Sequence, residues 1–149
     1  MKVRWKSISL LLTALVVLPL VLSQCRSRYK DVSHEPGYAE RVGQRCTVVK
    51  GLRAHGFTVD LRRKDVTHEV AVTTLPGIGG PEITFKVDIP KGTTIVVTGV
   101  RECWNCPFDR IDYAIRIPEL AELATHRVFA RSDALAPDQV QCVKQSPAS

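Results

Sequence analysis

The sequence has few aromatic residues and no apolar stretch of the length that a membrane-spanning helix needs. Phenylalanine, tryptophan and tyrosine make up 6% of the 149 residues, while 44% are hydrophobic and 24% are charged. The chain holds nine glycines and nine prolines, which are ordinary numbers for this length. These proportions fit one globular domain, and they exclude a collagen, a coiled coil, a membrane protein with several spans and a wholly disordered chain.

The residue patterns of common catalytic and metal sites are also absent. The four histidines have no HxH, HxxxH or HExxH spacing, and no Gly-x-Ser-x-Gly sequence marks a serine nucleophile. The glycine-rich stretch 77–80 precedes a strand-like segment rather than a helix, so it predicts a hairpin loop and not a phosphate-binding loop. We therefore expect a protein that is not an enzyme and that uses no metal ion or cofactor.

The first 24 residues have the pattern of a secretory signal peptide. Three basic residues among the first six precede an uncharged run at residues 8–22. A membrane-spanning helix needs about 20 apolar residues. This run is shorter, and Pro19 interrupts it near its end. We therefore expect residues 1–24 to be a signal peptide that directs export.

The leader also accounts for half of the net charge of +6. Three of the 21 basic residues and none of the 15 acidic residues lie in it, which leaves the exported chain at +3. So small an excess, with the two signs interleaved along the chain, predicts no nucleic-acid partner. The densest basic cluster, Arg62-Arg63-Lys64, is followed by Asp65 and predicts a solvated hairpin tip.

The end of the leader, Leu22-Ser23-Gln24-Cys25, resembles the lipobox of bacterial lipoproteins. The resemblance implies that Cys25 is diacylated, becomes the new N-terminus and attaches the chain to a membrane. Arg26, rather than an aspartate, follows that cysteine, which by analogy implies the outer membrane, facing the periplasm. Gln24 departs from the small residue usual at its position. Cleavage after Ser23 is the alternative, and it would give a soluble periplasmic or secreted protein.

The remaining cysteines are even in number, as two disulfides in an oxidising compartment require. We expect them to pair as Cys46–Cys142 and Cys103–Cys106, although four cysteines allow three pairings. The CxxC at 103–106 could also be a redox dithiol or half of a zinc site. It follows a strand rather than opening a helix, and its spacing from the other cysteines is not that of a zinc finger or ribbon.

Alternation of apolar and polar residues predicts a mainly β protein. The expected strands lie at 57–61, 66–74, 83–89, 93–100, 110–117, 126–131 and 140–143. Proline and glycine mark turns at 75–81 and 90–92, and residues 118–124 predict one short helix.

Short strands without intervening helices indicate a small single-domain β-barrel of SH3-like or OB-like size, with a β-sandwich as the alternative. The expected organisation is a polar tether at 25–44, a disulfide-stapled β domain at 45–145 and a C-terminal tail at 146–149.

These features predict a binding or structural module of the bacterial envelope. Loops at one end of the barrel, Leu75–Pro81 and Glu102–Asp109, would contact an unidentified envelope protein or glycan. Within the second loop, the candidate contact residues are Trp104, Asn105 and Phe108. Two alternatives stay open: an inhibitor or immunity-type protein that blocks an envelope enzyme, and a periplasmic thiol-redox protein that uses Cys103 and Cys106.

Overall fold

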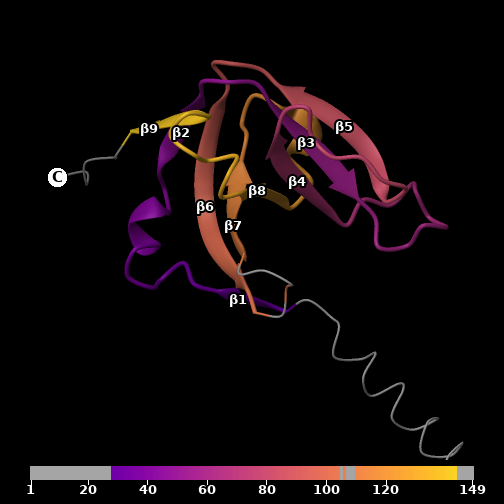
Figure 1. Ribbon diagram of the computed structural model, residues 1–149, viewed down its shortest axis with the longest axis horizontal. Coiled ribbons are helices and arrows are strands. Elements are labelled where there is room, and N and C mark those ends of the chain that lie inside the picture. Colours follow the sequence, from indigo (N-terminus) through magenta and orange to yellow (C-terminus); the bar gives the residue numbers. More distant parts are fainter. Residues whose placement is uncertain (1–27, 105, 107–109, 144–149) are drawn as a thin grey trace, which may run out of the picture.

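The chain folds into one β-rich domain, seen in a computed structural model that describes residues 28–104, 106 and 110–143 (Figure 1). Nine strands and two short 3₁₀ helices make up its regular structure. They are β1 (Tyr29–Asp31), η1 (Ala39–Arg41), β2 (Arg45–Val48), β3 (Leu52–Phe57), β4 (Glu69–Thr74), β5 (Ile83–Ile89), β6 (Thr94–Cys103), β7 (Arg110–Arg116), η2 (Ala121–Leu123), β8 (Val128–Arg131) and β9 (Val140–Val143).

All nine strands belong to one mixed sheet. Its order is β5-β3-β4-β8-β7-β6-β2-β9, and β1 pairs with the far end of β6. Neighbouring strands are antiparallel except β4 and β8, which run parallel. A barrel needs its two outermost strands to bond to each other, and β5 and β9 do not pair within the described residues. The mainly β prediction is confirmed, while the prediction of a closed SH3-like or OB-like barrel is wrong.

The sheet encloses one hydrophobic core on its inner face. β6 and β7 cross the middle of the molecule, with β3, β4 and β5 on one side and β2 and β9 on the other (Figure 1). Every strand from β2 to β9 contributes to the core. Its fully or nearly fully buried members include Val48, Leu52, Val72, Ile89, Ile95, Ile115, Ala130 and Val140. The core therefore joins strands that lie far apart in the sheet order.

The strand predicted at 57–61 is wrong. The chain leaves the sheet after Phe57, at the end of β3, and Val59 and Leu61 are 82% and 54% exposed. The Thr58 hydroxyl accepts a hydrogen bond from Asp60 N–H and donates to Arg63 O, so it holds a turn in place of a strand. The basic cluster 62–64 lies in this β3–β4 connection and is exposed, as expected of a solvated tip.

The segment expected to be a tether is folded from Tyr29 onward. β1 pairs with residues 101–103 of β6, and Val32 directly after it is 1% exposed. Residues 29–44 therefore belong to the domain. The pattern missed β1 because its three side chains are all exposed, so no apolar alternation marks the strand.

The helix expected at 118–124 is smaller than predicted, since only Ala121–Leu123 forms a 3₁₀ turn. None of the helices among the described residues has the length and apolar composition to cross a membrane. The leader, Cys25 and the C-terminal tail lie outside the described residues.

The described residues contain two disulfides, paired as expected. Cys46 and Cys142 are directly opposite each other on β2 and β9, near the two ends of the domain. Cys103 and Cys106 close a short loop between β6 and β7.

Candidate functional site

Charged residues gather on the outer face of the sheet, which is the face opposite the hydrophobic core. Asp112 on β7 lies directly between Arg101 on β6 and Arg131 on β8 in the strand register. Opposite charges on adjacent strands attract one another across the ladder. The register therefore brings an acid and two arginines together, although they are far apart in the sequence.

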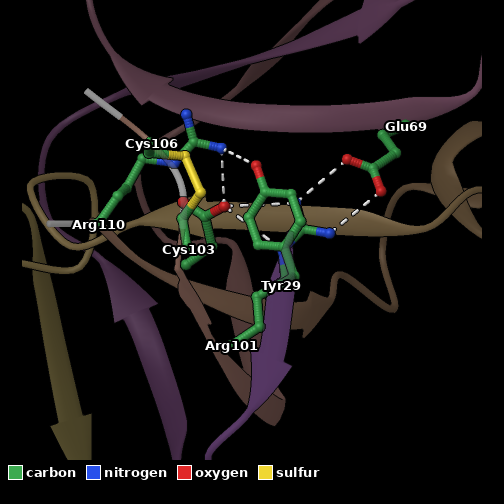
Figure 2. Close-up of a disulfide and its surroundings, with 7 residues drawn as sticks. Tyr29, Glu69, Arg101, Cys103, Cys106 and Arg110 are labelled. Atoms are coloured by element: carbon green, nitrogen blue, oxygen red, sulfur yellow. Dashed lines mark hydrogen bonds and ion pairs between the residues drawn. A yellow bond between two sulfur atoms is a disulfide. The ribbon is translucent and has the colours of Figure 1, made fainter. Parts of the chain in front are cut away.

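Arg101 is the centre of this cluster (Figure 2). Its Nη1 and Nη2 donate to the two oxygens of Glu69, each at 3.1 Å. Its Nε and Nη2 also donate to Asp112 Oδ2 at 3.3 Å. The guanidinium is stacked between two rings, 3.9 Å from the centre of Tyr29 and 3.3 Å from that of Phe129. Two carboxylates and two aromatic faces thus fix its position.

Asp112 is 2% exposed, which is unusual for a carboxylate. Its Oδ2 also accepts a hydrogen bond of 3.0 Å from Arg110, whose guanidinium donates to the Tyr29 hydroxyl as well. Within the described part of the chain, Asp112 Oδ1 and Arg110 Nε have no hydrogen-bond partner. Such groups are nearly always bonded when buried, so this cluster has hydrogen-bonding capacity that the described protein groups do not use.

A pocket of about 260 Å³ opens beside the cluster. Its walls combine apolar and charged side chains: Phe57, Glu69, Val70, Ala71, Thr73, Ile78, Arg101, Arg110, Asp112, Phe129 and Arg131. Thr73 Oγ1 is a third buried polar atom that lacks a partner among the described residues. Three arginines face two carboxylates, so the lining carries one net positive charge.

The pocket lies beside the two loops that the sequence predicted as contact regions. Ile78 comes from the loop at 75–81, and Arg101 and Arg110 flank the loop at 102–109. Trp104 is 73% exposed, and its backbone N–H donates to the backbone oxygen of Arg28 at 2.8 Å. The other two predicted contact residues, Asn105 and Phe108, lie outside the described residues.

The arginines and Asp112 were not predicted as site residues. The alternation of Asp112 with Ile111 and Tyr113 predicts only that it lies on the polar face of a strand. The available signal was the opposite charge of Asp112, within the strand predicted at 110–117, and of Arg101, directly after the strand predicted at 93–100. Without the strand order, this signal did not show which charges meet.

Cys103 is 4% exposed and Cys106 is half-buried, and the two are bonded to each other. A strand, not a helix, leads into Cys103. Redox dithiols typically open a helix whose N-terminus lowers the thiol pKa, whereas only six residues separate Cys103 from Arg110, the first residue of β7. Among the described residues, no group of three or more His, Cys, Asp or Glu side chains could hold a metal ion.

His55 on β3 lies fully buried beneath the loop at 75–81. Its Nε2 accepts a hydrogen bond of 3.3 Å from Ile78 N–H, and Nδ1 has no partner within the described residues. Gly77 crosses directly over the ring with a φ of +87°, and a Cβ there would lie 2.5 Å from His55 Nε2. The loop wall of the pocket therefore rests on an uncharged imidazole.

Acidification is expected to destabilise the domain through His55. Burial lowers the pKa of His55 below its usual 6.5, and the charges of Lys86 and Arg53 lower it further. The unfolded chain therefore binds this proton more readily, and stability falls as the pH drops below about 6.5, by at most about 1.4 kcal/mol per pH unit.

Urea denaturation at a series of pH values between 7 and 5 measures this effect. In a His55→Asn variant the slope over that interval is expected to be shallower than in the wild type. An equal slope in both proteins would assign the pH dependence to other groups.

No known protein family, curated protein or solved structure matches the chain.

Proposed function

We propose that the chain is an exported bacterial lipoprotein whose β domain is a non-enzymatic binding module. A lipid on Cys25 anchors it to the outer membrane, facing the periplasm, and the pocket beside Arg101 binds an acidic ligand. The observation that carries the binding role is the presence of buried hydrogen-bond donors with unused capacity around this pocket. Arg110 Nε and Thr73 Oγ1 have no partner in the part of the chain that is described, and both can donate to an acidic group.

The composition of the pocket favours a ligand that has a negative group and an apolar body. Phe57, Ile78 and Phe129 offer apolar contact. Among the three arginines, Arg101 is held by Glu69, Asp112 and two rings. Arg131 is freer, because its side chain is 51% exposed and its Nε lies 3.6 Å from Asp133. A carboxylate ligand would therefore meet Arg131 first, and it would add the missing negative charge.

Phenylacetate tests this proposal, because it joins a carboxylate to an aromatic ring and fits the pocket volume. In ¹H–¹⁵N NMR titrations we expect it to shift the backbone amides around Arg101, Phe129 and Arg131. A dissociation constant on the order of 1 mM is expected for a ligand of about ten non-hydrogen atoms. Phenylacetamide has the same shape without the charge, and it should bind more weakly.

An Arg131→Gln variant should weaken phenylacetate binding by about threefold to tenfold, the effect of losing one half-exposed hydrogen bond of ordinary net strength. Arg116→Gln is the matched control, since Arg116 is exposed at the far end of β7 and does not line this pocket. The binding role would be rejected if both variants behaved alike, or if phenylacetate and phenylacetamide shifted the same amides to the same extent.

The anchor is tested separately by the intact mass of the protein recovered from envelope fractions. A chain that begins at Cys25 and carries added acyl mass supports the lipoprotein. A chain that begins at Gln24 without acyl mass would make the protein soluble. Alkylation with and without reductant on the same sample counts the free thiols, and four thiols that react only after reduction agree with the two disulfides.

A further inference from the structure

We propose that the corner of the domain formed by β1 and the Cys103–Cys106 loop lies against the membrane, with Trp104 among the headgroups of anionic phospholipids. This inference rests on the proposed lipid at Cys25. It goes further by assigning a contact surface and an orientation to the folded domain. Three features support it: the length of the chain between the lipid and the sheet, the exposed Trp104 at that corner, and the charge of the connecting residues.

The connection between the lipid and the sheet is short. Only residues 26–28 lie between Cys25 and Tyr29, the first residue of β1. A fully extended chain spans at most about 3.6 Å per residue, so Tyr29 lies within about 14 Å of the acylated cysteine. The segment that was expected to act as a long tether is folded into the domain. The end of the sheet that holds β1 is therefore kept close to the membrane surface.

Trp104 lies at this end. β1 pairs with β6 so that Tyr29 is opposite Cys103, and the backbone N–H of Trp104 donates to the backbone oxygen of Arg28. The indole is 73% exposed, whereas tryptophan is usually buried for most of its surface. Figure 2 shows the disulfide beside Tyr29 and Arg110. Trp104 follows Cys103 in the loop that this disulfide closes. Tryptophan has an apolar ring and one N–H donor, and it is enriched where a membrane meets water.

The three residues that connect Cys25 to this corner carry positive charge, while on the sheet itself Lys30 pairs with Glu35 and lies opposite Glu102. Arg26 and Arg28 occupy two of the three connecting positions, and no acidic residue lies among them. Basic residues next to an anionic lipid surface each contribute about 1 kcal/mol to binding. A soluble protein partner could also bury Trp104, but the short connection leaves little room for one between this corner and the membrane. The lipid surface is therefore the occupant that the geometry favours.

Intrinsic fluorescence tests the contact, because Trp104 is the only tryptophan left once the leader with Trp5 is removed. The acylated protein is reconstituted into phosphatidylcholine vesicles that contain one quarter phosphatidylglycerol. We expect a blue-shifted emission, quenching by phospholipids brominated near the headgroup, and protection from aqueous acrylamide. A water-like emission that acrylamide quenches fully would overturn the proposed orientation, even with the acyl chains present.

A tryptophan placed elsewhere is the matched control. Gln141 on β9 is exposed and pairs with Thr47, which pairs with Thr94 at the start of β6. That position lies nine residues from Cys103 along β6, or about 30 Å at the usual rise of a strand. Gln141→Trp in a Trp104→Phe background should remain water-exposed in the same vesicles. Equal lipid quenching at both positions would contradict a specific contact at the β1 corner.

The intact mass of the same sample separates this inference from the anchor itself. Acyl mass on Cys25 together with a water-exposed Trp104 rejects the contact and leaves the lipoprotein proposal in place. An absence of acyl mass rejects both, because the short connection then no longer holds the corner at a membrane.

Discussion

Replacing Arg101 with methionine is expected to lower the free energy of unfolding by about 3–5 kcal/mol, the usual cost of removing one partner from a buried ion pair. The Arg101 side chain is 15% exposed and forms ion pairs with Glu69 and Asp112, whose side chains are 33% and 3% exposed. Methionine retains an unbranched apolar chain between the two rings, so packing is largely kept. The loss of unfolding free energy therefore reports mainly the removal of the positive charge.

The destabilised group in this variant is Asp112. It would keep Arg110 as an ionic partner but lose two hydrogen bonds from Arg101 to the same oxygen. Because Asp112 Oδ1 already lacks a partner among the described residues, this carboxylate has little other compensation for its burial. Adding Asp112→Asn to Arg101→Met removes the uncompensated charge. The double variant should be more stable than the sum of the single losses predicts, by about 0.5–3 kcal/mol.

Urea denaturation followed by circular dichroism measures all three variants. Arg53→Met is the matched control, since Arg53 pairs with Asp88, whose side chain is 70% exposed. Solvent screens that pair, and its loss should be much smaller than that of Arg101→Met. Equal losses for Arg53→Met and Arg101→Met would mean that the cluster on the outer face has no special role in stability.

The strands were predictable from the sequence to the extent that one of their faces is buried. In β5 and β6 the apolar side chains alternate or form a β-branched run, and the predicted ranges agree with the structure to within a few residues. β3 was missed because His55 and Gly56 are also buried and interrupt the alternation. β1 was missed because it has no buried face at all.

The strand order could not be predicted in the same way. β4 and β8 pair in parallel although more than fifty residues separate them in the sequence. Alternation shows which side of a strand is apolar, but it carries no information on which strand lies beside it. The barrel prediction failed at this step. The candidate site was missed for the same reason, because only the pairing of β6, β7 and β8 brings Arg101, Asp112 and Arg131 together.

Loss of the Cys46–Cys142 disulfide should be the second large effect, with a cost of about 2–5 kcal/mol for the Cys46→Ala, Cys142→Ala double variant. The two cysteines are 96 positions apart, so the bond closes a loop that contains most of the domain. In the chain-entropy account, a long loop restricts the unfolded chain more than a short one. The bond also joins β2 to β9, the outermost strand on that side of the sheet.

The Cys103–Cys106 disulfide provides an internal comparison. It spans only three positions, and the same account gives about 2 kcal/mol for so short a loop. We therefore expect Cys103→Ala, Cys106→Ala to unfold at a higher urea concentration than the Cys46, Cys142 double variant. The reverse order would show that the short loop stabilises the native cluster around Arg110 and Tyr29 directly. The chain-entropy effect alone could not produce that result, because the unfolded chain gains far less conformational freedom when the disulfide that closes the smaller loop is removed.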